Sequence, residues 1–142
     1  MRACELCAGD GGEPLHADAT LRVVAVDDAL HPGFCRVIWQ QHVREMTDLD
    51  PSARAHLMQV VFATEQAMRE VLAPAKINLA SLGNLTPHLH WHVIARFRDD
   101  PHFPAPVWAA PSGRAAVALP AGWRAALRQR LAELLPGGAA GP

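Results

Sequence analysis

Hydrophobic and polar positions along the chain predict a pair of β-strands followed by a long helix. Residues 21–28 (LRVVAVDD) and 34–41 (FCRVIWQQ) are rich in β-branched and aromatic side chains, and the ALHPG between them contains both proline and glycine. This pattern predicts a hairpin. Asp50 is an expected N-cap and Pro51 an expected first helical residue, and apolar side chains then recur at helical spacing until Pro74.

The pattern in the second half of the chain predicts two further strands and a second helix. Residues 76–83 (KINLASLG) predict a third strand, residues 86–97 (TPHLHWHVIARF) a fourth, and residues 122–135 (GWRAALRQRLAELL) a second amphipathic helix. Consecutive strands, one long helix and then more strands are typical of an α+β domain with an antiparallel sheet. We therefore expect a single domain over residues 1–135 and a flexible tail over residues 136–142.

Composition limits the classes of partner. The chain has 142 residues, 50% of them hydrophobic, which is enough for one core. Its 13 Lys and Arg against 14 Asp and Glu leave a net charge of -1, so we expect a small-molecule ligand rather than a nucleic-acid polymer or an anionic membrane. The N-terminal MRACELCAGDGG lacks the apolar core and cleavage pattern of a signal peptide, and we expect a cytoplasmic protein.

Three histidines alternate with apolar residues in the fourth expected strand: His88, His90 and His92. Residues two apart point to the same face of a strand, so the imidazoles share one face. The other face carries an apolar stripe made of Leu89, Trp91, Val93, Ala95 and Phe97. This stripe explains how the strand is anchored to the core. Burial does not explain the imidazoles, because each would need a polar partner if covered.

Alternating histidines suit two kinds of chemistry. Two adjacent imidazoles of a His-x-His pair can bind one metal ion, which with a further ligand and water makes a hydrolytic site. Alternatively, a neutral imidazole can attack phosphorus while its neighbour hydrogen-bonds the phosphate oxygens. Three successive residues on one face span about 13 Å, so at most two adjacent ones can reach the same ion.

The segment HLHWHVI matches the pattern His-φ-His-φ-His-φ-φ, in which φ is apolar, and so resembles the histidine triad (HIT) superfamily of nucleotide hydrolases and transferases. The upstream KINLASLGN resembles the family's Asn-containing strand with its turn, and DDALHPGFCRVIWQQHV resembles the stretch in which a ribose-binding acid precedes a strand and a His-Val pair. The resemblance covers about residues 4–108. It implies a HIT-like α+β fold with a five-stranded antiparallel sheet, and a homodimer whose two sheets join.

The resemblance also implies roles for two members of the triad. His90 would attack the α-phosphorus of a nucleoside phosphate, of the phosphoramidate or dinucleoside polyphosphate type, and form a nucleotidyl-histidine. Water would then hydrolyse this intermediate, or another phosphate would accept the nucleotide. His92 would hydrogen-bond the non-bridging phosphate oxygens, where charge must be held through the transition state.

Other positions match the family's substrate-binding residues. Asn78 and Asn84 fall where polar side chains of the family contact the phosphate or position the triad. Asp28 is the candidate for the ribose hydroxyls, with Asp27 as the alternative. Many members have Gly-Gln in the turn before the triad, whereas this chain has the shorter Asn84 there. The contact to the leaving group or phosphate is then either lost or supplied by Thr86.

One branch of the family holds zinc through a Cys-x-x-Cys near the N-terminus, a His before a Val, and the first triad histidine. The matching residues are Cys4, Cys7, His42 and His88. Two thiolates and two imidazoles make a closed tetrahedral site with no position left for water. The resemblance thus implies a structural Zn²⁺ that leaves His90 free, and no catalytic metal.

Three functions remain open at this stage. The first is a histidine triad enzyme with a covalent intermediate. The second is a zinc metallohydrolase that uses His88 and His90, and the third is a zinc-stabilised nucleotide-binding module with little turnover. Among the remaining residues, Cys35 fits a buried hydrophobic position, and Arg96 continues the histidine face, where it either helps with phosphate charge or is solvated.

Overall fold

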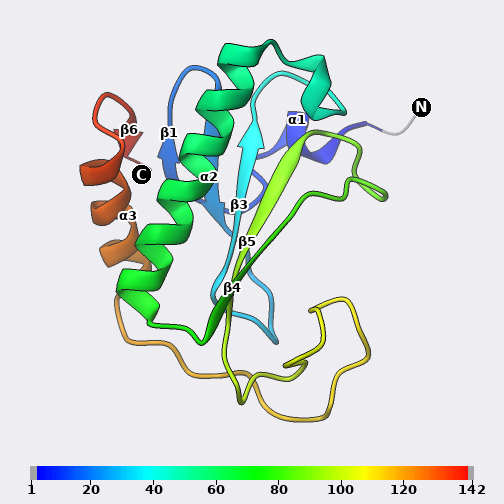
Figure 1. The fold of residues 1–142 in the computed structure, drawn as a ribbon, viewed down its shortest axis with the longest axis vertical. Coiled ribbons are helices and arrows are strands. Elements are labelled where there is room, and N and C mark those ends of the chain that lie inside the picture. The colour runs from blue at the N-terminus through cyan, green and yellow to red at the C-terminus, as the bar shows by residue number, and fades with distance from the viewer. Residues whose placement is uncertain (1–2, 141–142) are drawn as a thin grey trace.

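The computed structural model describes residues 3–140, which form one antiparallel sheet with helices on both of its faces (Figure 1). The elements in chain order are α1 (Glu5–Ala8), β1 (Glu13–Ala17), β2 (Leu21–Ala25), β3 (Phe34–Trp39), the 3-10 turn η1 (Met46–Asp48), α2 (Pro51–Leu72), β4 (Lys76–Ala80), β5 (His90–Arg96), α3 (Trp123–Leu134) and β6 (Ala139–Ala140). None of the helices in this part of the chain is long and apolar enough to cross a membrane.

The sheet contains the five antiparallel strands that the resemblance implies, with a short sixth strand at one edge. The strand order is β4-β5-β3-β2-β1-β6. Strands β2 and β3 form the expected hairpin, in which Leu21 pairs with Trp39 and Ala25 with Cys35. The sequence pattern did not reveal β1. The tail expected over residues 136–142 contributes β6, which pairs with β1, while residues 141–142 lie outside the described residues.

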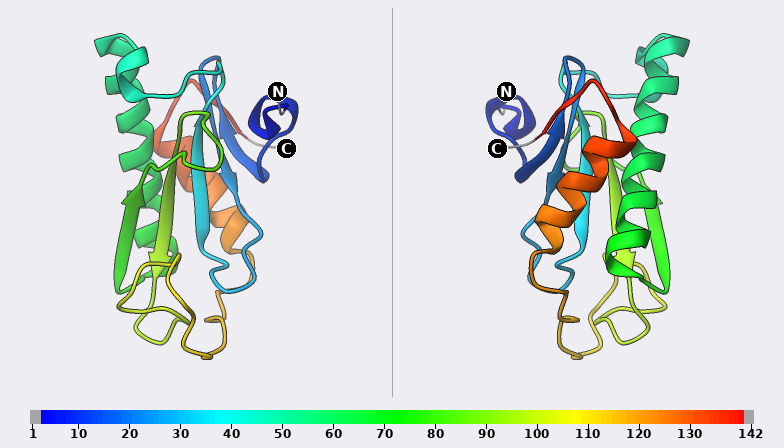
Figure 2. Two further views of the ribbon diagram at one scale, coloured as in Figure 1. Left: turned by 90° about the vertical axis from the view of Figure 1, so that its right-hand side faces the viewer. Right: turned by 90° about the vertical axis from the view of Figure 1, so that its left-hand side faces the viewer.

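Helix α2 begins and ends where the sequence predicts. The Asp50 side chain accepts a hydrogen bond from the Ala53 N–H at 2.8 Å, and Pro51 occupies the first turn, where its missing N–H has no cost. The helix ends at Leu72, before Pro74, and Ala73 adopts a left-handed conformation at φ 47°. Figure 2 shows α2 and α3 on the same side of the sheet, where α3 confirms the second expected helix.

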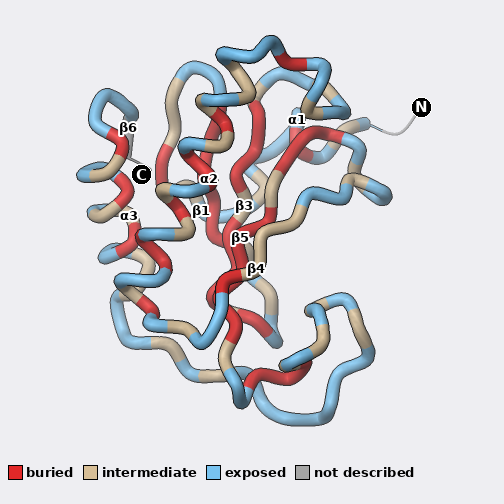
Figure 3. Tube along the Cα trace, viewed as in Figure 1, coloured by how far each residue is buried: buried red, intermediate tan, exposed pale blue. Residues whose placement is uncertain are grey.

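The core lies between this helical layer and the sheet. The apolar stripe predicted for the histidine strand packs into this core, together with residues from α2 and α3. Buried residues run along the central strands and the inward sides of the helices (Figure 3). Cys35 also lies there, and its burial raises the pKa of the thiol to about 12. This confirms Cys35 as a buried residue.

We call the opposite side of the sheet the histidine face, because it carries His90 and His92. The short helix α1 lies on this side (Figure 2), where Leu6 packs against Val24 and Ile38. Arg22 of β2 holds α1 and the turn after it to the sheet. Its guanidinium donates hydrogen bonds to three backbone carbonyls of residues 6–10, at 2.7 to 3.0 Å, and to the Gln40 side chain. The N-terminal segment is therefore packed close to the start of β5.

Candidate functional site

The sequence pattern predicted all three triad histidines on one strand. The structure differs, because only His90 and His92 lie on that strand. Strand β5 begins at His90, so His88 lies just before it. The backbone between them still pairs with its neighbours, because the Leu89 N–H donates to the Val43 carbonyl at 2.8 Å. All three imidazoles are buried, with exposures of 1% for His88 and 6% for each of His90 and His92. The three side chains have different partners.

His88 lies in a cluster with the other three residues of the expected zinc site. Its Nδ1 atom is 3.3 Å from the Cys4 Sγ atom, 3.5 Å from the Cys7 Sγ atom and 3.2 Å from the His42 Nδ1 atom. The four potential ligand atoms all lie within 4.8 Å of one another. The fold therefore brings together residues that are 84 positions apart in the sequence.

The chemistry of this cluster fits a metal ion. The His88 Nε2–H donates to the Trp39 carbonyl at 2.6 Å, so the Nδ1 lone pair is directed toward the thiols. A hydrogen bond with the Cys4 thiol is the largest cause that raises the pKa of Cys7, and burial and the charge of Cys4 act in the same direction. Two sulfur and two imidazole ligands at these separations could hold an ion of the size and softness of zinc.

His90 has a different hydrogen bond, which sets its tautomer. Its Nδ1 atom lies 2.6 Å from the backbone carbonyl of His88, and only a protonated Nδ1 can donate to that oxygen. The lone pair is therefore on Nε2. Burial lowers the pKa of His90, so the ring is neutral at pH 7. A neutral imidazole with a free Nε2 atom can act as a nucleophile.

His92 lies next to His90 among aromatic rings. The two imidazoles meet edge to face at 4.9 Å between ring centroids, and the rings of Phe34 and Trp108 each lie 5.3 Å from His92. Burial, followed by the charges of His90 and Arg36, lowers the pKa of His92 to about 4. Its Nδ1 atom is buried and has no hydrogen-bond partner within residues 3–140.

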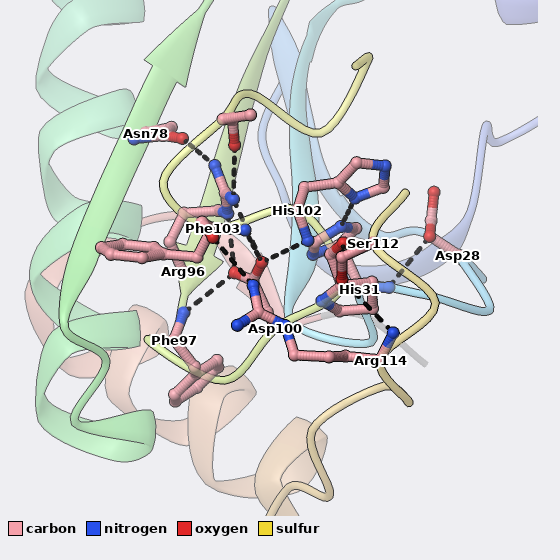
Figure 4. A network of polar contacts seen from close by, with 12 residues as sticks. Asp28, His31, Asn78, Arg96, Phe97, Asp100, His102, Phe103, Ser112 and Arg114 are labelled. Carbon is pink, nitrogen blue, oxygen red and sulfur yellow. Dashed lines mark hydrogen bonds and ion pairs between the residues drawn. The ribbon is translucent and has the colours of Figure 1, made fainter. Parts of the chain in front are cut away.

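The far end of β5 carries a buried ion pair (Figure 4). Arg96, which is 2% exposed, donates to both carboxylate oxygens of Asp100 at 2.8 and 3.1 Å. It also donates to the Asn78 Oδ1 atom at 2.8 Å and to the Ala105 carbonyl at 2.7 Å. Burial opposes ionisation of Asp100, but Arg96 and three backbone N–H groups hold the pKa of this carboxyl far below its usual range. Arg96 is thus neither solvated nor available to a phosphate.

The same network joins two loops below the sheet. The His102 Nδ1 and His31 Nε2 atoms are 2.7 Å apart, and Asp28 accepts hydrogen bonds from two backbone N–H groups of its own loop (Figure 4). Asp27 points elsewhere, because its carboxylate lies 2.9 Å from Arg124 of α3. Of the two neighbouring acids, only Asp28 belongs to the network that continues to Arg96 and Asn78.

The residues before the triad contribute contacts that the sequence did not reveal. Thr86 donates to the Glu5 carboxylate at 2.9 Å, so α1 is tied to the loop that leads into β5. The Ser81 hydroxyl donates to the His90 carbonyl at 2.7 Å. Asn84 is exposed, and no side-chain hydrogen bond of it occurs within residues 3–140. Pairings between distant segments such as Glu5 and Thr86 leave no periodic signal in the sequence.

Comparison with known families agrees with this architecture. A family model for the HIT domain matches residues 15–99. The chain therefore belongs to the histidine triad family, and the resemblance seen in HLHWHVI is confirmed. A comparison with curated proteins finds no match.

Solved structures of histidine triad proteins share the fold. One from Bradyrhizobium japonicum is 29% identical, with 86% of this chain and 92% of that chain covered and a TM-score of 0.72. One from Marinobacter aquaeolei is 27% identical, with 94% and 95% covered and a TM-score of 0.70. A Zn-bound histidine triad family protein from Mycobacterium smegmatis is 22% identical, with 92% of each chain covered and a TM-score of 0.62, and shows likeness of fold alone.

Proposed function

We propose that the protein is a nucleotide hydrolase or nucleotidyltransferase that acts at the α-phosphorus of a nucleoside phosphate through a covalent intermediate on His90. The observation that carries this proposal is the 2.6 Å contact between the His90 Nδ1 atom and the His88 carbonyl. This contact leaves the Nε2 lone pair available and holds the ring in one orientation. A histidine with an unfixed tautomer would present the reactive nitrogen only part of the time.

The proposed reaction has two steps at phosphorus. The His90 Nε2 lone pair forms a P–N bond as the bond to the leaving group breaks, and the leaving group keeps that electron pair. Water, which releases a proton to solvent, or an acceptor phosphate then forms a P–O bond as the P–N bond breaks, which returns the lone pair to Nε2. His92, 4.9 Å from His90 between ring centroids, would stabilise the charge on the non-bridging oxygens.

Substrate contacts remain part of this proposal. Asp28 is preferred over Asp27 for the ribose hydroxyls, because Asp27 is already paired with Arg124. Asn78 would act through Arg96, to which it is hydrogen-bonded, and so position the end of β5. Asn84 and Thr86 would contact the phosphate or the leaving group from the loop before the triad. Thr86 would have to release Glu5 to do so.

We also propose that Cys4, Cys7, His42 and His88 hold a structural zinc ion. With all four positions filled by protein atoms, such an ion would tie the N-terminal segment to the start of β5 and supply no water or Lewis acid to the reaction. The metal-binding group does not include His90, which supports the structural alternative over a metallohydrolase that uses His88 and His90. The Zn-bound protein from Mycobacterium smegmatis supports the same choice of metal.

A homodimer is the proposed assembly. Strand β4 is an edge strand of the sheet, so the backbone groups along its outer side are free to pair with a second copy. Leu82 and Leu85, which follow β4, are exposed large apolar side chains. Light scattering of the purified protein tests this, with twice the mass of the chain as the expected result.

The activity is tested by release of AMP from adenosine 5'-phosphoramidate. We expect turnover by the native chain and a loss of at least about a thousandfold in kcat/KM for His90→Ala, because the nucleophile is removed. His56→Ala is the matched control, since His56 lies on α2 and pairs with Asp18. This variant should keep native activity.

Two other results would replace the proposal. Turnover by the native chain that forms no nucleotide adduct on His90 and stops when zinc is removed would establish the metallohydrolase. AMP binding without turnover of phosphoramidate or dinucleoside polyphosphates would establish the nucleotide-binding module.

A further inference from the structure

Within the described residues, one arginine on the histidine face has no side-chain hydrogen bond or ion pair. Arg36 of β3 lies directly across from His92 of β5 in the antiparallel register. Residues directly opposite each other point to the same side of the sheet, with Cβ atoms about 4.5 to 5.5 Å apart. Arg36 therefore belongs to the histidine face, one strand away from the triad. The sequence analysis assigned it no role.

The other arginines of this face differ from Arg36 in their contacts. Arg22 donates four hydrogen bonds, and Arg96 is held by Asp100, Asn78 and a backbone carbonyl. Within residues 3–140, Arg36 makes no side-chain hydrogen bond and no ion pair within 4 Å, and its Nε atom is buried. An arginine with five donors in a fixed fork is thus present without an acceptor.

Burial disfavours the positive charge of the Arg36 side chain, and no carboxylate of the described residues forms an ion pair with it. Burial is the largest effect and lowers the pKa of Arg36, while the more distant carboxylates of Glu5 and Asp28 act in the opposite direction. In turn, the positive charge of Arg36 lowers the pKa of both His90 and His92. The guanidinium is therefore close enough to both imidazoles for its charge to be felt at the proposed reaction centre.

A second unsatisfied nitrogen lies opposite this arginine. In the part of the chain that the structure describes, the Nδ1 atom of His92 is buried without a hydrogen-bond partner, like the Nε atom of Arg36. Buried polar atoms are nearly always hydrogen-bonded, and each exception destabilises the protein unless a ligand or water satisfies it. Two such atoms on directly opposed residues indicate a position where a ligand supplies acceptors. Phosphate oxygens match both the charge and the forked geometry of a guanidinium.

We propose that Arg36 is a substrate-binding residue that donates hydrogen bonds to phosphate oxygens of the nucleotide held against His92. The inference rests on the proposed function of the same site, to which it adds a phosphate-binding cation. Recognition of the nucleotide then depends on its phosphate charge. Arg36, rather than Arg96, supplies the positive charge expected on this face.

The test is equilibrium binding, measured by calorimetry with AMP and with adenosine, which need no turnover. Arg36→Met should lower the affinity for AMP by about tenfold or more, the equivalent of losing one charge-assisted hydrogen bond, and change the affinity for adenosine less than about threefold. Arg36→Lys should recover part of the loss. Arg69→Met is the matched control, because it removes the same charge from α2 on the other side of the sheet.

A stability measurement separates binding from folding. If Arg36 only supported the fold, Arg36→Met would lower the free energy of unfolding; we expect it to be unchanged or higher, because a buried unsatisfied nitrogen is removed. An equal loss of affinity for AMP and adenosine, or no loss for AMP, would overturn the inference. If the native chain binds neither compound, the proposed function fails. In that case, pyrophosphate binding by the native chain that Arg36→Met weakens would still support a phosphate-binding site at Arg36. If the native chain does not bind pyrophosphate, or if Arg36→Met binds it equally well, this site is overturned too.

Discussion

At the start of β5, His88 lies among two thiols and a second imidazole, whereas at its end Arg96 lies against the carboxylate of Asp100. Both groups of side chains link distant parts of the chain to the same strand. The Arg96 group contains opposite charges, and its hydrogen bonds are made within the protein. The other group contains no such pair of opposite charges, because it consists of two thiols and two imidazoles: Cys4, Cys7, His42 and His88.

This difference distinguishes side chains of β5 that stabilise the fold from side chains that could bind a ligand. A group whose charges and hydrogen bonds are satisfied internally stabilises the fold and needs no ligand. A group of metal-ligating atoms without a counter-charge could instead be completed by a cation. Between them, His92 and Arg36 each retain a buried nitrogen without a partner within residues 3–140, and we propose that a phosphate of the substrate is bound there.

The largest effect is expected from breaking the ion pair. Asp100→Ala leaves the Arg96 guanidinium buried without its carboxylate and removes the acceptor of three backbone N–H groups. Loss of one partner of a buried pair costs about 3 to 5 kcal/mol. Urea unfolding at pH 7 measures this, and a loss below about 1 kcal/mol would contradict the structural role assigned to the pair.

A somewhat smaller effect is expected at the other end. Cys4→Ser should abolish stoichiometric zinc binding, and with it the stabilisation of about 2.7 kcal/mol that an ion at a hundredfold excess over its Kd provides. Metal analysis and unfolding with and without chelator measure both quantities. Cys35→Ala is the control, since Cys35 is buried in the core and should leave zinc content intact. Zinc retained by Cys4→Ser would contradict the ligand assignment.

As the pH is lowered, protonation of the buried histidines should reduce the stability of the fold before protonation of Asp100 does. Burial lowers the pKa of His16 and His31, and that of His92 to about 4, from the usual histidine value of 6.5. Below pH 6.5 the unfolded chain binds protons that the folded chain does not, so stability falls as pH decreases from 6.5 toward 4. Asp100, whose pKa is lowered, keeps its contribution until pH falls below about 3.8.

Urea midpoints measured between pH 7.5 and 4.5 test this order. A midpoint that stays constant down to pH 5 would show that the buried histidines titrate normally. Chelator should be present throughout, because release of any zinc bound by the cysteines would add a separate dependence on pH.

The smallest effect is expected at the ion pair between Asp27 and Arg124, which is exposed, unlike the buried pair between Arg96 and Asp100. Asp27 is 94% exposed and faces Arg124 at 2.9 Å, so Asp27→Ala should change the free energy of unfolding by less than about 0.5 kcal/mol. It should also leave the KM for adenosine 5'-phosphoramidate unchanged, whereas Asp28→Ala should raise it. A raised KM for Asp27→Ala alone would assign the ribose to Asp27.

Local patterns explain what could be predicted from the sequence. The hairpin, the capped start of α2 at Asp50 and the apolar stripe of β5 all arise from periodicity or from neighbours in the chain. The expected zinc residues also meet in the structure. That expectation came from the family resemblance, because spacing alone does not place Cys4 beside His88.

The features that the sequence did not reveal depend on contacts between distant segments. The free charge on Arg36 and the paired charge on Arg96 cannot be told apart in the sequence, since both follow strand alternation. Asp100 decides the difference, and it lies in a loop with no periodic signal. The start of β5 at His90 rather than before His88 likewise depends on pairing with segment 39–43.

The most direct measurement of the central claim is the mass of the intact protein after rapid mixing with adenosine 5'-phosphoramidate and a quench without acid. The account predicts a transient adduct of one adenylyl group that maps to His90 and is missing in His90→Ala. Turnover by the native chain with no adduct at any mixing time, under conditions that preserve a phosphoramidate bond, would contradict it.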